Sequence, residues 1–145
     1  MQEMEMEYSR RDLKWLVPAV MAAELTAQKT VLESKTYRHE DLTVRTNGEN
    51  RSRAILNGLT HTSFPIEMHE TELAPGLAPH PAHHHPHEEM ILIREGTMEV
   101  TIAGSVSKLG PGSVAFVASN EEHGWRNAGT DRAKYFVIAL GQGKG

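Results

Sequence analysis

The chain has 145 residues, with 15 Lys and Arg against 19 Asp and Glu, and it contains no cysteine. This length fits one domain with a hydrophobic core of its own. The formal net charge of -4 and the lack of a basic, aromatic-rich stretch argue against nucleic acid as a partner. Because no thiolate is available, any bound metal must be held by His, Asp or Glu.

Residues 1–30 are expected to form an N-terminal arm or an export signal. The hexapeptide at residues 9–14 is SRRDLK, which is similar to a twin-arginine signal, and a short apolar run follows it. The alternative is an amphipathic helix over residues 13–27, whose apolar side chains recur at helical spacing. The first interpretation places the protein in the periplasm, and the second leaves it in the cytoplasm.

Residues 31–145 are expected to form a single β-barrel domain. The part before residue 58 is polar and contains only short patterned runs, with a turn expected at residues 47–50. Three arginines cluster there, Arg45, Arg51 and Arg53, either as a solvated face that meets acidic patches or as a clamp for an anionic substrate. Apolar and alternating runs follow, broken by Gly and Pro, which favours an all-β sandwich or barrel. The expected strands cover residues 65–73, 90–93, 97–102, 113–118 and 135–140.

A histidine-rich segment precedes the second of these strands. Five of the nine histidines fall between His80 and His87. Side chains two residues apart on an extended chain point to the same side, so His83 and His85 can converge. Glu89 lies four residues further on, again an even step, and can join them.

A fourth ligand must come from a distant part of the chain. His123 is the candidate because it follows the apolar run at residues 114–118. Three imidazoles and one carboxylate suit a divalent transition metal. The predicted metal ligands are therefore His83, His85, Glu89 and His123, while His80, His84 and His87 are expected to be solvated loop residues.

These residues resemble the first sequence motif of the cupin superfamily, which is His-x-His, three or four residues, Glu, six residues and Gly. Here the motif is formed by His83, His85, Glu89 and Gly96. Every position agrees in residue type and spacing.

The second motif of that family is kept in part. His123 and Asn127 have its spacing, whereas Ala118-Ser119-Asn120 replaces its Pro-x-Gly turn. Asn120 can take the positive φ that the glycine would supply.

The resemblance implies an antiparallel jelly-roll (cupin) β-barrel of the small single-domain (cupin 2) type. It also implies one divalent transition metal per chain, either Mn, Fe, Zn, Ni or Co. The implied function is a metalloenzyme acting on a small polar substrate, with dioxygenase, isomerase or lyase/hydrolase chemistry open. The alternative is a non-catalytic cupin that binds or senses a sugar or a small acid.

Three further expectations concern catalysis and partners. His69, on the strand that leads to the histidine-rich segment, is the candidate acid or base, with a packed or surface histidine as the alternative. Met90 and Leu92 are out of phase with Glu89 and should face outward, which favours a homodimer that covers them. The expected ligand is a small molecule in the barrel, with neither nucleic acid nor membrane as a partner.

Overall fold

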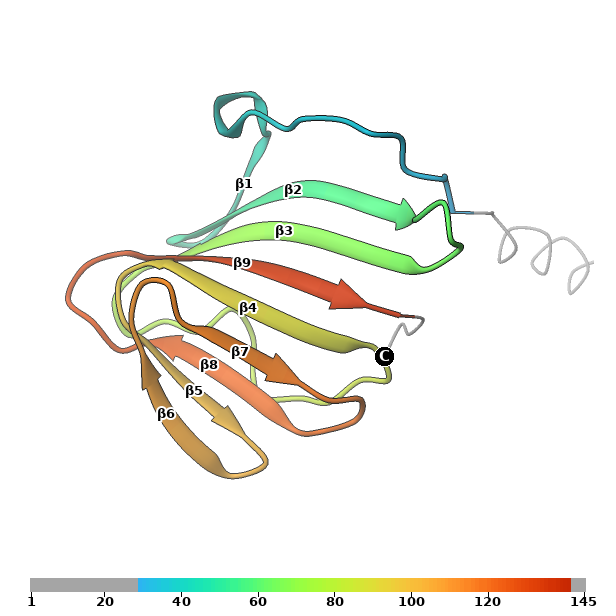
Figure 1. The fold of residues 1–145 in the computed structure, drawn as a ribbon. Coiled ribbons are helices and arrows are strands. Elements are labelled where there is room, and N and C mark those ends of the chain that lie inside the picture. The colour runs from blue at the N-terminus through green and yellow to red at the C-terminus, as the bar shows by residue number, and fades with distance from the viewer. Residues whose placement is uncertain (1–28, 142–145) are drawn as a thin grey trace, which may run out of the picture.

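The computed structural model describes residues 29–141, which form two antiparallel β-sheets packed face to face (Figure 1). The export-like hexapeptide and the amphipathic pattern at residues 9–27 lie outside the described residues. Within the described part, no helix is long and apolar enough to cross a membrane. In chain order the elements are η2, a 3-10 helix (His39–Asp41), β1 (Val44–Asn47), β2 (Asn50–Leu59), β3 (Pro65–Leu73), β4 (Glu88–Glu95), β5 (Met98–Ile102), β6 (Ser105–Leu109), β7 (Val114–Val117), β8 (His123–Asn127) and β9 (Ala133–Leu140).

The larger sheet has the order β1-β2-β3-β9-β4-β7, and the smaller one has the order β6-β5-β8. The last strand, β9, lies between β3 and β4 and is drawn in red in the middle of the larger sheet (Figure 1). All strand pairs are antiparallel. This arrangement is a jelly-roll barrel, and it confirms the fold expected from the sequence.

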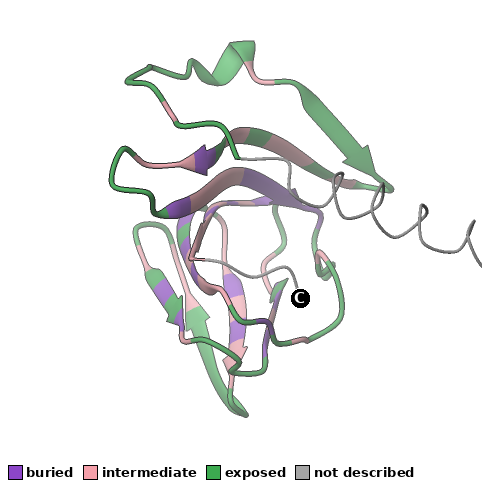
Figure 2. Cartoon of the chain, turned by 90° about the vertical axis from the view of Figure 1, so that its right-hand side faces the viewer, coloured by how far each residue is buried: buried purple, intermediate pink, exposed green. Residues whose placement is uncertain are grey.

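The two faces of the larger sheet differ because side chains alternate along each strand. Ile91 on β4 and Val137 on β9 are buried against the smaller sheet. On the opposite face Leu92, Val114 and Phe116 are 39%, 55% and 50% exposed. Figure 2 shows the buried positions gathered where the two sheets face each other, with β1 exposed throughout. The outward orientation expected for Leu92 is confirmed.

The hairpin of β1 and β2 is the main departure from the sequence-based expectation. The turn at residues 47–50 is present, with Gly48 at φ 59°, but it joins a four-residue strand to a ten-residue strand. β2 lacks the alternation of apolar and polar residues that marks a strand in a sequence, because its polar side chains pair with polar side chains of β3. Arg53 lies opposite Glu70, and the two form an ion pair at 3.0 Å.

Glu70 is the centre of a buried charge network on the outer side of β3. Its side chain is fully buried, and its carboxylate lies 3.0 Å from Arg53, 2.9 Å from Arg94 and 2.9 Å from His39. Arg53 also contacts Glu72 at 3.0 Å. These contacts link η2, β2, β3 and β4. Arg53 thus meets acidic residues, as the first of the two alternatives expected, but its side chain is mostly buried rather than solvated.

Candidate metal centre

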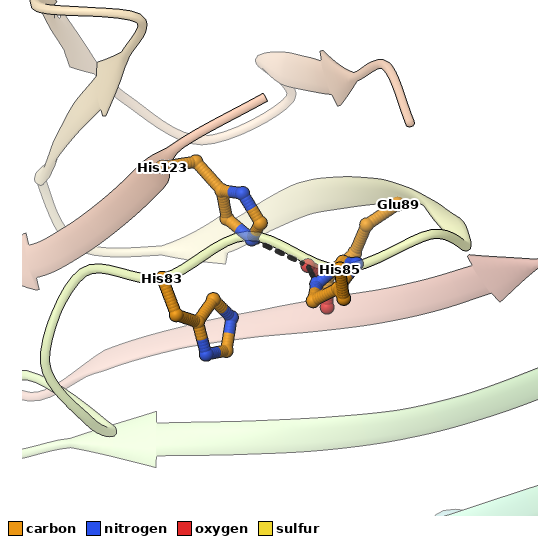
Figure 3. A group of neighbouring side chains, drawn as sticks. All are labelled: His83, His85, Glu89 and His123. Atoms are coloured by element: carbon orange, nitrogen blue, oxygen red, sulfur yellow. Dashed lines mark hydrogen bonds and ion pairs between the residues drawn. The ribbon is translucent and has the colours of Figure 1, made fainter. Parts of the chain in front are cut away.

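Three histidines and one glutamate converge between the two sheets (Figure 3). His83 and His85 lie on the chain before β4, Glu89 is the second residue of β4, and His123 begins β8. Each side chain offers one ligand atom, and these four atoms all lie within 4.8 Å of one another. His83 is half-buried, and the other three residues are buried. The structure thus brings together the four residues that the sequence singled out.

Backbone hydrogen bonds hold the histidine-rich segment in place. His83 and His123 form an isolated antiparallel bridge, with N–H groups that donate to each other's carbonyls at 3.0 and 2.9 Å. The N–H of Asn120 donates to the carbonyl of His85 at 2.8 Å. Asn120 has φ 63°, as expected for the residue that replaces the motif glycine. The chain around His83 and His85 is therefore held like a strand, and it bends at residues 86–87 before β4 begins.

The orientation of two imidazoles is fixed by backbone carbonyls. Nδ1 of His85 lies 2.8 Å from the carbonyl of His87, and Nδ1 of His123 lies 2.9 Å from the carbonyl of Glu121. A carbonyl only accepts, so both Nδ1 atoms carry the proton. In the neutral rings, Nε2 then presents a lone pair toward the centre of the site.

These lone pairs point at the same carboxylate oxygen. Oε2 of Glu89 lies 3.2 Å from Nε2 of His85 and 3.0 Å from Nε2 of His123. Three acceptors that converge without a donor repel one another unless a proton sits on each imidazole or a cation lies among them. A divalent cation would satisfy all three together. The donor set thus fits a metal ion, and imidazole with carboxylate suits Mn, Fe, Co, Ni or Zn.

His83 is held in the neutral form that ligates a metal. Burial lowers the pKa of its imidazole, and the neighbouring His80, His123 and His85 lower it further, against the opposing effect of the Glu89 carboxylate. A neutral His83 can offer a lone pair alongside those of His85 and His123.

Two neighbouring histidines stack on two members of this group. The ring of His80 lies 4.1 Å from that of His83, with 23° between the planes. The ring of His87 lies 3.6 Å from that of His85, at 6°. His80 is exposed, as expected of a loop residue, although its ring also contacts that of His83. His87 is half-buried rather than fully solvated.

His69 lies apart from the four-residue group but on the same inner side of the larger sheet. On β3, Glu67 is the cross-strand partner of Ala139, which in turn partners Glu89. His69 follows two residues later and therefore faces the same way. Its Nδ1 lies 2.8 Å from Oε1 of Glu67. Sequence reasoning missed Glu67, although the same two-residue parity could have linked it to His69.

The aromatic residues beside the group belong to the core. The indole N–H of Trp125 donates to the hydroxyl of Tyr135 at 2.8 Å, and both residues are buried. Burial raises the pKa of the Tyr135 hydroxyl, so it stays protonated. The Trp125 ring also stacks on His123, with 5.5 Å between centroids. Both residues are therefore part of the hydrophobic core.

Comparisons with known proteins agree with this geometry. Residues 69–139 match the family described as the cupin domain. A comparison with curated proteins finds no match. Solved structures share the fold: an RmlC-like cupin from Shewanella frigidimarina (TM-score 0.64, 16% identity, 76% of this chain and 93% of that one), the polyketide cyclase RemF from Streptomyces resistomycificus (0.62, 20%, 78% and 83%) and KdgF from Halomonas sp. (0.64, 13%, 76% and 96%).

The fold and the site define a class, a small jelly-roll barrel with three histidines and one glutamate gathered inside it. Residues 69–139 of this chain form a cupin domain. At these identities the solved structures show the fold alone. The reaction that a cupin site supports depends on the residues that line it.

Proposed function

We propose that this protein is a metal-dependent enzyme that acts on a small polar molecule bound inside the barrel. The observation that supports it most is the meeting of two Nε2 atoms with one carboxylate oxygen of Glu89, at 3.0 and 3.2 Å, where no donor is available from the neutral rings. His83, His85, Glu89 and His123 would hold the ion. When bound there, a divalent metal supplies Lewis acidity and leaves coordination positions open for a substrate.

The chain also offers a group for proton transfer on the same inner face. Hydrogen bonding of Nδ1 to Glu67 orients the imidazole of His69 and leaves its Nε2 free to exchange a proton. Glu67, Ala139 and Glu89 are successive cross-strand partners, so Glu67 and Glu89 lie on the same face of the larger sheet. We infer that His69 is the acid or base and that Glu67 orients it.

The reaction class stays open among dioxygenase, isomerase and lyase or hydrolase chemistry. One structural neighbour is a polyketide cyclase, and the same fold supports different reactions through different pocket residues. The His69–Glu67 pair favours reactions that move a proton, because a general acid or base would serve them directly.

The test is a comparison of chelator-stripped protein with protein reloaded separately with Mn, Fe, Co, Ni or Zn. Oxygen uptake reports dioxygenase activity, and proton NMR of a panel of sugars and small acids reports isomerisation or cleavage. We expect turnover that needs a metal and is lost in Glu89→Gln but kept in His84→Ala, which alters an exposed neighbour outside the group. Turnover that survives stripping would contradict metal dependence. Saturable binding without turnover would favour the non-catalytic alternative.

We further propose a homodimer formed through the outer face of β9, β4 and β7. The outer side of β3 is not part of this face, because its Glu70 is already buried among its own ion-pair partners. Exposed Leu92, Val114 and Phe116 supply its apolar surface. Sedimentation equilibrium should show a dimer that Phe116→Glu dissociates, and a monomeric wild type would rule it out.

A further inference from the structure

A second hollow lies at the β1–β2 hairpin, apart from the metal centre. It is a cavity of about 180 Å³, and its lining includes Arg45, Asn47, Arg51, Ser52 and Thr71. None of the described residues that line it is acidic. The volume is below that of a pocket for a whole drug-sized ligand, so it suits one functional group of a molecule.

The walls of this cavity are fixed by Asn50. The side chain of this residue accepts a hydrogen bond from the N–H of Ala74 at 3.3 Å and donates one to the carbonyl of Ala78 at 3.1 Å. These bonds join the hairpin to the loop after β3, which contributes Pro79 to the lining. The cavity therefore exists before any ligand arrives, which lowers the entropic cost of binding.

The three arginines of this region differ in their partners. Arg53 is paired with Glu70 and Glu72 at 3.0 Å, and Arg51 lies 3.8 Å from Glu72. Among residues 29–141, Arg45 has no ion pair and no side-chain hydrogen bond. Its guanidinium is thus the charge in the cavity that lacks a counter-ion within the described chain.

Strand register places a neutral donor, Ser52, beside Arg45. Its cross-strand partner is Ser52, and the partner of Ser52 on the next strand is Thr71. The three residues share one face of the sheet because cross-strand partners point the same way. A planar guanidinium next to a serine hydroxyl is a donor set suited to an oxyanion, to which arginine can donate two parallel hydrogen bonds.

We propose that this cavity binds the oxyanion group of a small molecule, a carboxylate or a phosphate, with Arg45 as the charged donor and Ser52 as the neutral one. The site is separate from the metal centre. The lining extends from β1 to β3, and Arg45 lies on β1, four strand spacings or about 19 Å along the sheet from β4. We therefore expect anion binding at Arg45 not to require a metal held by Glu89 and its neighbours.

The test is an NMR titration of ¹⁵N-labelled protein with inorganic phosphate and, separately, with sodium acetate, at constant ionic strength. We expect saturable shifts of the Ser52 and Thr71 amides and of Arg45 Nε, and the tighter of the two anions identifies the preferred oxyanion. Arg45→Ala should weaken this binding at least about tenfold, since a hydrogen bond to a charged group is lost. Arg45→Lys keeps the positive charge but lacks the two parallel N–H donors of the guanidinium, so its anion affinity should lie between those of the wild type and Arg45→Ala.

The matched control is Arg126→Ala, which removes an exposed arginine that is paired with Glu99 on the smaller sheet. It should leave the affinity unchanged, and so should Glu89→Gln, which separates this proposal from the metal-dependent function. Equal affinity in wild type and Arg45→Ala would overturn the proposal, as would shifts that rise linearly without saturation. If Arg45→Ala loses its native spectrum, the anion affinity of Arg45→Lys is the deciding measurement. An affinity equal to that of the wild type would show that the two parallel hydrogen bonds of the guanidinium are not used, and it would overturn the proposed site.

Discussion

Asn127, the last residue of the second motif, is predicted to stabilise the barrel through the hydrogen bonds of its side chain. Replacing it tests this structural role. Its side chain is fully buried and makes three hydrogen bonds. The amide nitrogen donates to the carbonyls of Leu73 at 2.9 Å and Asp131 at 2.7 Å, and the amide oxygen accepts from the N–H of Gly129 at 2.9 Å. One side chain thus joins the ends of β3 and β8 to the loop that leads into β9.

The expected cost of Asn127→Ala follows from these contacts. Three hydrogen bonds at about 1 kcal/mol each give about 3 kcal/mol, and their buried partners, left unsatisfied, raise the loss to about 3–5 kcal/mol. Asn127→Asp keeps the shape and the acceptor for Gly129 but turns two donated bonds into contacts between a carboxylate and carbonyls. It should therefore destabilise the protein at least as much near neutral pH.

The measurement is urea unfolding of the chelator-treated protein, followed by Trp fluorescence. Chelation matters because a bound ion would add its own stabilisation. Asn57→Ala, an exposed asparagine on β2, is the matched control and should change the free energy of unfolding by no more than about 0.5 kcal/mol. A loss below about 1 kcal/mol for Asn127→Ala would refute the reasoning from buried hydrogen bonds.

Two further predictions concern charge and ring stacking. Burial alone would raise the pKa of Glu70, but hydrogen bonds and charges of His39 and Arg94 outweigh it and hold the pKa below its ordinary value. The stabilisation from this carboxylate is full above about pH 4.3 and is lost on further acidification. The stability gap between wild type and Glu70→Gln should thus shrink from pH 7 to about pH 3 in urea titrations, and a constant gap would contradict this. His87→Ala should weaken metal binding in a chelator competition, whereas His87→Phe, which keeps a ring over His85, should restore it; equal affinities would exclude a role for stacking.

The four residues of the metal centre could be predicted because they follow rules of local geometry. His83, His85 and Glu89 are related by even steps along the chain, and the bridge of His83 to His123 and the start of β4 at Glu88 hold the two ends of this segment extended. The outward direction of Leu92 followed from the same parity.

Features that depend on pairing between distant strands could not be predicted from the sequence. β2 has a polar pattern, and it is a strand because Arg53 meets Glu70 across the sheet. The row from Glu67 through Ala139 to Glu89 requires β9 to lie between β3 and β4, which a single sequence does not reveal. Sheet order, rather than residue pattern, carries this information.

The most direct test of the central claim is the metal content of the purified protein after stripping and reloading, measured by elemental analysis. We predict about one transition-metal ion per chain in the wild type and in His84→Ala, and little bound metal in His83→Ala and Glu89→Ala. Wild-type metal content in both of the latter variants, with native circular dichroism, would contradict the site formed by these residues.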